Sequence, residues 1–183
     1  TTNDPADQEL FFRWASLGAF SPVMRTHHGT HAQVNVQWFT NAETVAHFKR
    51  QAELHVRLFP YLRKLADDAV APGGLPLWVP LPLLYPDDDV WAIKDEVLLG
   101  PSLLVAPVVM RGAVSREVTY PSGRWVPFLV EGAAVTGPVT VTVEAPLDAL
   151  PVFVPAGGIV PLLATPVQTL VADHADGTQA IAA

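Results

Sequence analysis

Cysteine is absent from this sequence, and charged residues are scarce. The lack of cysteine excludes disulfides and thiolate metal sites. Charged residues make up only 16% of the chain and hydrophobic residues 50%, a balance that argues against intrinsic disorder. The 11 basic residues form no stripe and are outnumbered by 18 acidic ones, so no nucleic-acid partner is expected. No apolar run reaches the roughly 18 residues that cross a bilayer, so no membrane partner is expected.

Proline is rare in the first part of the chain. Only Pro5, Pro22 and Pro60, of 18 prolines, precede residue 70. Such a shift in composition indicates a change of architecture along the chain. The chain starts at Thr1, with neither an initiator Met nor a signal-peptide pattern. We therefore expect a piece of a longer protein.

The N-terminal half has the pattern of helices. Asp4 and Pro5 suit the cap and first turn of a helix that runs to about Gly18. Residues 40–43 (TNAE) have a capping-box pattern and predict the start of a second helix. The predicted apolar face of this second helix consists of Val45, Phe48, Ala52, Val56 and Phe59.

Proline and glycine mark where this second helix is interrupted. Pro60 is expected to kink or break it, and residues 72–74 (PGG) are expected to end the helical region. Residues 19–39 connect the first two helices. Connections of this length are usually functional or disordered.

The C-terminal half, from about Leu98, has the pattern of short strands. Residues 139–144 (VTVTVE) alternate as a half-buried strand should. Residues 114–128 predict a hairpin that turns at residues 121–124 (PSGR). Further short strands are predicted at residues 103–105, 108–110, 152–154 and 159–162. Strands at this spacing are typical of a small antiparallel sandwich.

Five segments carry a resemblance to a known family. Residues 9–27 (ELFFRWASLGAFSPVMRTH) contain a helix motif that runs into an R-x-H loop. The other segments, in order, are LFPYL at 58–62, LGPSLLVAPV at 99–108, YPSGRW at 120–125 and PVFVPAGGIVPL at 151–162. Together they resemble glycoside hydrolase family 31 and occur in that family's order.

The resemblance implies an α+β fragment. Residues 1–88 would be the C-terminal segment, with the terminal helices, of a (β/α)8 TIM barrel. Residues 89–183 would be the antiparallel β-sandwich that follows the barrel. This division agrees with the helix-then-strand pattern of the residues themselves.

The resemblance also implies a function. The whole protein would be a retaining α-glycosidase that hydrolyses α-linked glycosides or oligosaccharides, most of all α-glucosides. Retention requires two carboxyl groups roughly 5–5.5 Å apart. In the family resembled, both are aspartates upstream of the segments found here, so this chain alone is expected to contain neither and to be inactive. No cofactor is expected.

His27 is the site residue that the resemblance assigns most clearly. In the family resembled, the histidine of the R-x-H loop binds hydroxyls of the sugar at the cleavage site, and an imidazole can both donate and accept hydrogen bonds. Arg25 and Trp38 are further substrate-site candidates, although Arg25 could instead pair with a carboxylate or carbonyl at the barrel rim. The trio of His27, His28 and His31 lacks carboxylate or cysteine partners at ligand spacing, so no metal is expected.

Two departures from the family pattern concern its charged anchors. The family often has arginine before P-L where this chain has Val79, and before A-G where it has Pro155. Both losses put the substrate subclass in question more than the fold. The alternative interpretation is a non-catalytic carbohydrate-binding or structural module. If the barrel is incomplete, Phe11, Trp14 and Phe48 should be partly exposed, which would favour association.

Overall fold

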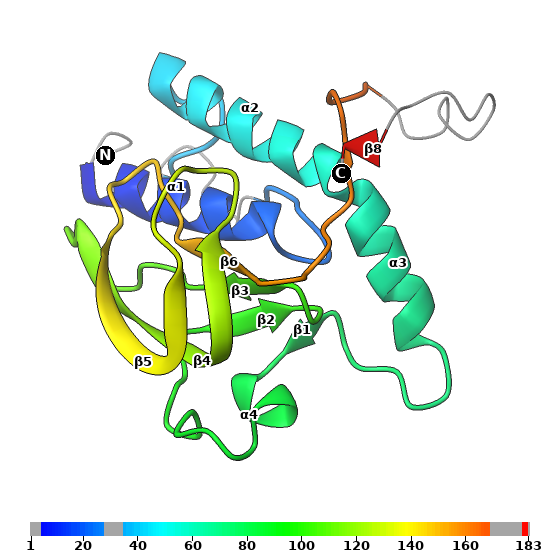
Figure 1. Ribbon diagram of the computed structural model, residues 1–183. Coiled ribbons are helices and arrows are strands. Elements are labelled where there is room, and N and C mark those ends of the chain that lie inside the picture. Colours follow the sequence, from blue (N-terminus) through cyan, green and yellow to red (C-terminus); the bar gives the residue numbers. More distant parts are fainter. Residues whose placement is uncertain (1–4, 28–34, 169–180, 183) are drawn as a thin grey trace.

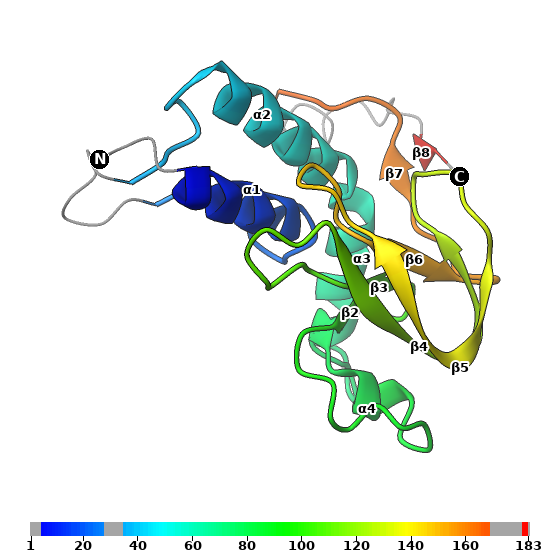
Figure 2. The ribbon, with the colours of Figure 1, turned by 90° about the vertical axis from the view of Figure 1, so that its left-hand side faces the viewer.

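The computed structural model describes residues 5–27, 35–168 and 181–182 (Figure 1). The helical region comes first, as predicted. Its helices are α1 (Pro5–Ala19), α2 (Ala42–Arg57) and α3 (Phe59–Ala69). Figure 2 shows α1 and α2 lying side by side, with α3 extending beyond α2. Within the described ranges, every helix is too short or too polar to cross a lipid bilayer.

The N-terminal cap of α2 differs in detail from the predicted one. Asn41, not Thr40, is the cap, and its side chain accepts a hydrogen bond from the Thr44 amide at 2.9 Å. The Thr44 hydroxyl accepts the reciprocal bond from the Asn41 amide at 3.0 Å. The predicted pattern was therefore shifted by one residue, and a threonine takes the place of the expected glutamate.

The buried face of α2 is polar, which corrects the predicted apolar face. Thr44, His47 and Gln51 are buried, whereas Val45 is 42% exposed. The reason is that α1 offers polar partners. The His47 ring lies 3.1 Å from the Phe12 carbonyl through Nε2 and stacks on the Phe12 ring at 4.1 Å.

Pro60 interrupts the helical region as predicted. α2 ends at Arg57 and α3 starts at Phe59, with Pro60 in its first turn, where no backbone donor is needed. Leu58 between them is completely buried. The break turns the chain so that Tyr61, on α3, reaches the sheet. Its hydroxyl donates to the Leu99 carbonyl at 2.7 Å.

The described strands are β1 (Trp78–Val79), β2 (Val97–Leu99), β3 (Leu103–Val105), β4 (Ser115–Pro127), β5 (Val135–Glu144), β6 (Val152–Pro155), β7 (Leu162–Leu163) and β8 (Ile181–Ala182). A short helix, α4 (Leu81–Leu84), follows the first strand. Six strands form one antiparallel sheet in the order β1-β2-β3-β6-β4-β5, and a second sheet pairs β7 with β8. β4 and β5 make a long curved ribbon at one side (Figure 1).

The predicted hairpin at residues 114–128 is wrong, because β4 is one continuous strand there. The pairing with β5 shifts its register between Tyr120 and Gly123, so residues 121–122 form an irregularity in the strand and not a turn. Asp88 holds this irregularity in place. Its carboxylate accepts hydrogen bonds from the Ser122 amide and hydroxyl, both at 2.6 Å. Gly123 has φ of 119°, a value that favours glycine.

Two other predicted strands are also corrected. Residues 108–110 lie in a loop, where Val109 and Met110 are 63% and 71% exposed. Of residues 159–162, only Leu162 lies in a strand. Apolar runs next to proline in this chain therefore do not all enter the sheet, because proline gives no backbone donor to a ladder.

One arginine makes several of the hydrogen bonds that join the helical region to the β region. Arg13, on α1, donates to four carbonyl oxygens of the β region, those of Ala113, Ala145, Pro146 and Ala149, at 2.7–3.3 Å. Apolar packing adds to this attachment. One core cluster joins Phe20 and Leu62 of the helical region to Leu99 and Val105 of the sheet.

Candidate functional site

The R-x-H loop begins in a well-ordered turn. The chain leaves α1 at Ala19, and the Phe20 and Ser21 amides donate back to the carbonyls of Leu17 and Gly18. The Ser21 hydroxyl then bonds the Gly18 and Val23 carbonyls at 2.7 and 3.0 Å. This turn, residues 17–23, is called the loop root below.

Arg25 and His27 contact each other on the exposed part of the loop. The Arg25 guanidinium lies 3.0 Å from Nδ1 of His27. Arginine can only donate, so Nδ1 is the acceptor and the neutral ring carries its proton on Nε2. The alternative for Arg25 is a carboxylate or carbonyl partner at the barrel rim. In the described part of the chain its hydrogen-bond partner is the imidazole.

Trp38 lies in a small aromatic group with Phe39 and Phe48. Its ring meets Phe39 edge-on at 5.3 Å and lies 6.5 Å from Phe48 on α2. Trp38 is 43% exposed and Phe39 61%. An exposed indole face is chemically suited to stack on a sugar ring.

The histidine trio cannot be compared as a set, because His28 and His31 lie outside the described residues. Among the residues that are described, no group of three His, Cys, Asp or Glu side chains could hold a metal ion.

Several acidic side chains have structural partners. Asp67 and Asp68 form exposed ion pairs with Arg63 and Lys64, as a solvated helix face predicts. The Glu9 carboxylate accepts from the Gly112 amide at 2.8 Å. These contacts explain the acids without catalysis.

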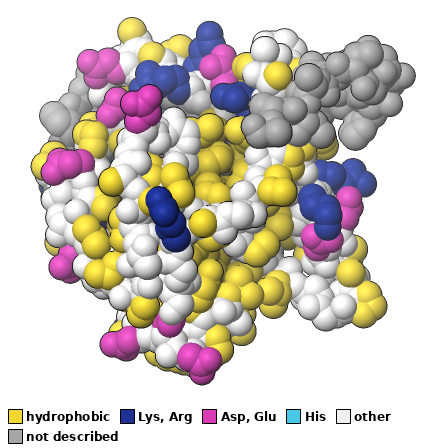
Figure 3. All heavy atoms as spheres, viewed as in Figure 1, with side chains coloured by type: hydrophobic (Ala, Val, Ile, Leu, Met, Phe, Trp, Pro, Cys, Tyr) yellow, Lys and Arg dark blue, Asp and Glu magenta, His cyan; other side chains and the backbone are white. Residues whose placement is uncertain are grey.

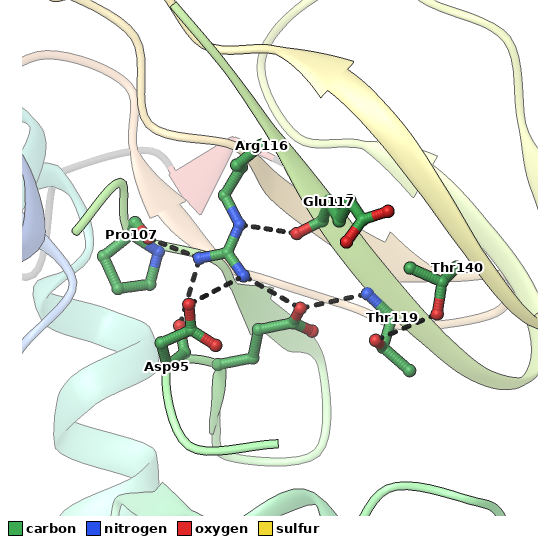
Figure 4. Close-up of polar contacts among 7 residues, drawn as sticks. Asp95, Pro107, Arg116, Glu117, Thr119 and Thr140 are labelled. Atoms are coloured by element: carbon green, nitrogen blue, oxygen red, sulfur yellow. Dashed lines mark hydrogen bonds and ion pairs between the residues drawn. The ribbon is translucent and has the colours of Figure 1, made fainter. Parts of the chain in front are cut away.

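Glu96 is a buried carboxyl group that the sequence pattern did not single out. Its Oε1 accepts from Arg116 and from the Thr119 amide, both at 3.0 Å, while Oε2 is buried without a partner among the described residues. Arg116 also contacts the Asp95 carboxylate at 3.4 Å (Figure 4). Burial outweighs Arg116 and raises the pKa of Glu96 to about 7. The group stabilises a strand junction, because its partners are a strand backbone and an arginine.

An apolar groove lies between α1 and the loop at 107–111, with a volume of about 490 Å³. We call it the α1 groove. Trp14 and Met110, both in its lining, are 64% and 71% exposed. Phe11 and Phe48 are half-buried. The expected partial exposure of the helical region's large apolar side chains is therefore observed.

Comparison with known proteins identifies the two regions. Residues 2–65 match the model of the glycosyl hydrolases family 31 TIM-barrel domain, and residues 74–160 match that of the family 31 C-terminal domain. The sulfoquinovosidase of Agrobacterium fabrum is 40% identical over 147 residues, which are 79% of this chain and 22% of that protein.

The chain belongs to glycosyl hydrolase family 31. A probable α-glucosidase of Oryza sativa is 38% identical over 162 residues, covering 85% of this chain and 18% of that protein. The solved structure of a family 31 dextranase from Flavobacterium johnsoniae matches with a TM-score of 0.80 at 36% identity. That match covers 88% of this chain and 20% of the dextranase. The chain thus spans about a fifth of the length of these relatives.

Family membership confirms the predicted fold class: helices of a TIM barrel's end are followed by an antiparallel β region. The relatives named above are glycosidases of different specificity. Figure 3 agrees with the charge pattern of the sequence, since the basic side chains on the face shown form no continuous stripe and several of them lie beside acidic ones.

Proposed function

We propose that the whole protein is a retaining α-glycosidase, and that this chain contributes the R-x-H loop of the active site. The observation that carries the proposal is the position of His27. It follows α1 within the residues that match the family's TIM-barrel domain. In the family resembled, the histidine of the R-x-H motif lies on the loop after the last barrel strand, and active sites of TIM barrels lie on the loops that follow their strands.

The proposal assigns a role to each candidate residue. His27 would hydrogen-bond hydroxyls of the sugar at the cleavage site, using Nε2–H as a donor, while Arg25 holds the ring through Nδ1. Trp38 would offer its exposed face to a sugar ring. The nucleophile and the acid/base, two carboxyl groups roughly 5–5.5 Å apart, would come from barrel strands upstream. This chain by itself would then be inactive.

The proposed domain division keeps residues 1–88 with the barrel and 89–183 with the C-terminal domain. The family models match residues 2–65 and 74–160, and β1 at Trp78–Val79 already pairs with β2 of the sheet. The exact boundary stays a prediction. Limited proteolysis of the whole protein, followed by mass spectrometry, would locate it.

The sugar is proposed to be an α-glucoside, in keeping with relatives such as the rice α-glucosidase. A second candidate is an α-sulfoquinovoside, because the sulfoquinovosidase of Agrobacterium fabrum is 40% identical to this chain. Aryl α-glucoside, α-xyloside and α-sulfoquinovoside substrates, assayed in parallel with the whole protein, separate these possibilities.

The test of the function itself is the stereochemistry of the first product. The whole protein should release an α-configured sugar from an aryl α-glycoside, as followed by proton NMR before mutarotation. Release of the β-anomer would contradict retention. Binding of oligosaccharides without turnover would instead favour a non-catalytic carbohydrate-binding module.

A further inference from the structure

The loop root is held by a residue of the sheet. Trp78, on edge strand β1, donates its indole N–H to the Phe20 carbonyl at 2.9 Å. The Phe20 ring is 4% exposed and meets the ring of Phe128, which follows β4, edge-on at 6.1 Å. The C-terminal region thus hydrogen-bonds the backbone of Phe20 and packs against its side chain.

The helical region holds the neighbouring residue. Nδ1 of His55, on α2, lies 3.1 Å from the Ala19 carbonyl. A carbonyl oxygen can only accept, so Nδ1 of His55 carries the proton in this contact. Adjacent carbonyls at the loop root, those of Ala19 and Phe20, are therefore fixed by different parts of the molecule.

Trp78 lies next to a position where this chain departs from the family pattern. It stands directly before Val79, which occupies the place where the family resembled often has arginine. Because residue 79 is a valine, which is 1% exposed in the core, this position carries no charged anchor. The neighbouring indole supplies a neutral donor that ties the same strand to the barrel region.

We infer that Trp78 is a positioning residue, through which the C-terminal sheet sets the position of His27 in the active site. This inference rests on the proposed function of His27. Phe20 lies seven residues before His27, and the Ser21 hydrogen bonds stiffen the first residues between them. A shift of the loop root would therefore displace His27 relative to the sugar. Small misplacements of a binding group have large effects on rate.

The test is a double-mutant cycle in the whole protein with the aryl α-glycoside that it cleaves. Trp78→Phe removes the indole N–H and keeps an aromatic ring, and we expect it to lower kcat/KM about tenfold. In a His27→Ala background the same change should alter kcat/KM by less than about twofold, because its effect passes through His27.

Trp91→Phe is the matched control. It removes another indole–carbonyl bond, from Trp91 to Pro86 at 3.1 Å, on an exposed loop of the C-terminal region. It should leave kcat/KM unchanged. Phe128→Leu, which weakens the grip on the Phe20 ring, should show the same non-additivity with His27→Ala as Trp78→Phe.

The outcomes separate the two claims. An inactive whole protein would overturn the proposed function. The positioning role would be overturned, and the proposed function left intact, by either of two results in an active protein. One is that Trp78→Phe lowers kcat/KM by the same factor with and without His27→Ala. The other is that Trp78→Phe alone leaves kcat/KM unchanged. Thermal unfolding of each variant shows whether a loss of activity reflects a loss of folding. If Trp78→Phe does not fold, the non-additivity of Phe128→Leu with His27→Ala tests the positioning role instead.

Discussion

Glu96 shows how burial controls the charge of a single residue. The folded-state pKa of this carboxyl is about 7, above its ordinary value of 4.5, chiefly because burial disfavours the charged form. As pH rises from 4.5 towards 7, the unfolded chain releases this proton and the folded chain keeps it. Stability from this group is thus present in acid and lost as pH rises.

Replacing Glu96 with Gln should remove that loss. Between pH 5 and pH 8 the wild-type chain should lose up to about 3 kcal/mol of unfolding free energy through this group, and the Gln variant should not. Urea unfolding at both pH values measures the difference. Glu117→Gln is the control, because Glu117 is exposed and directly follows Arg116, the partner of Glu96. This variant should lose as much unfolding free energy between pH 5 and pH 8 as the wild-type chain. An E96Q chain that still weakens by the same amount would contradict the assignment.

His47 behaves in the opposite sense. Burial lowers the pKa of its imidazole below 6.5, and the hydrogen bond to the Phe12 carbonyl only partly offsets this. As pH falls below 6.5, the imidazole of His47 is therefore protonated in the unfolded chain at a higher pH than in the folded chain. The stability that the neutral ring gives to the α1–α2 contact is lost over that range.

We expect His47→Gln to remove this acid-induced weakening while keeping an amide donor for the Phe12 carbonyl. Hydrogen exchange of α1 and α2 amides at pH 7 and pH 5 is the measurement. Ser16→Ala is the control, because it removes only the hydroxyl that lies 3.2 Å from the ring. In this variant the protection of the α1 and α2 amides from exchange should still fall in acid. An acid response in the Gln variant equal to that of wild type would rule out His47 as its source.

Arg13 joins elements that are distant in the sequence. Its guanidinium serves carbonyls from residues 113 and 145–149, so one side chain of α1 closes two loops of the sheet region. Burial lowers the pKa of Arg13, and Glu9 opposes this shift. The planar guanidinium has five N–H donors spread over three nitrogens and suits four carbonyls at once, whereas a lysine has three donors on a single nitrogen.

Arg13→Lys should therefore destabilise the chain by about 2–3 kcal/mol, since several charge-assisted hydrogen bonds are lost together. The measurement is the midpoint of chemical unfolding. Arg111→Lys, an exposed arginine of the same groove, should change it by less than about 0.5 kcal/mol. Equal effects of the two substitutions would show that Arg13 is not the main link.

The elements were predictable where the determinant was local. Pro5 marked the start of α1, Pro60 the break before α3, and the alternation at residues 139–144 the strand β5. The polar face of α2 was missed because His47 finds its partner on α1, 35 residues away. The false hairpin at 121–124 has the same origin, since Asp88, a remote residue, holds Ser122 in an extended strand.

The site followed the same rule. His27 and Arg25 came from a motif that lies within one short segment. The indole bond from Trp78 to Phe20 spans 58 residues, so no local pattern encodes it. The hydrogen bond between Arg25 and His27 is local, but it depends on the conformation of the loop rather than on the motif alone. The buried Glu96 could not be told from an exposed glutamate by its neighbours in sequence.

At the scale of the whole molecule, the α1 groove is an uncovered apolar surface. Leu10, Trp14 and Met110 are each more than half exposed. Contiguous apolar surface of this kind favours association. The chain expressed alone should therefore self-associate as its concentration rises.

Sedimentation velocity tests this expectation. Leu10→Gln combined with Trp14→Gln should shift the chain towards monomer. Val70→Gln should not, although Val70 is 86% exposed, because it lies outside the groove. A wild-type chain that stays monomeric at every concentration would contradict the prediction.

The central claim is that this chain brings a sugar-binding histidine to an active site whose carboxylates lie elsewhere in the protein. The most direct measurement is kcat/KM of the whole protein on its aryl α-glycoside before and after His27→Ala, with Thr26→Ala as the neighbouring control. We predict a fall of at least about 100-fold for His27→Ala, with an unchanged melting temperature, and little change for Thr26→Ala. Undiminished activity of the folded His27→Ala protein would contradict the account.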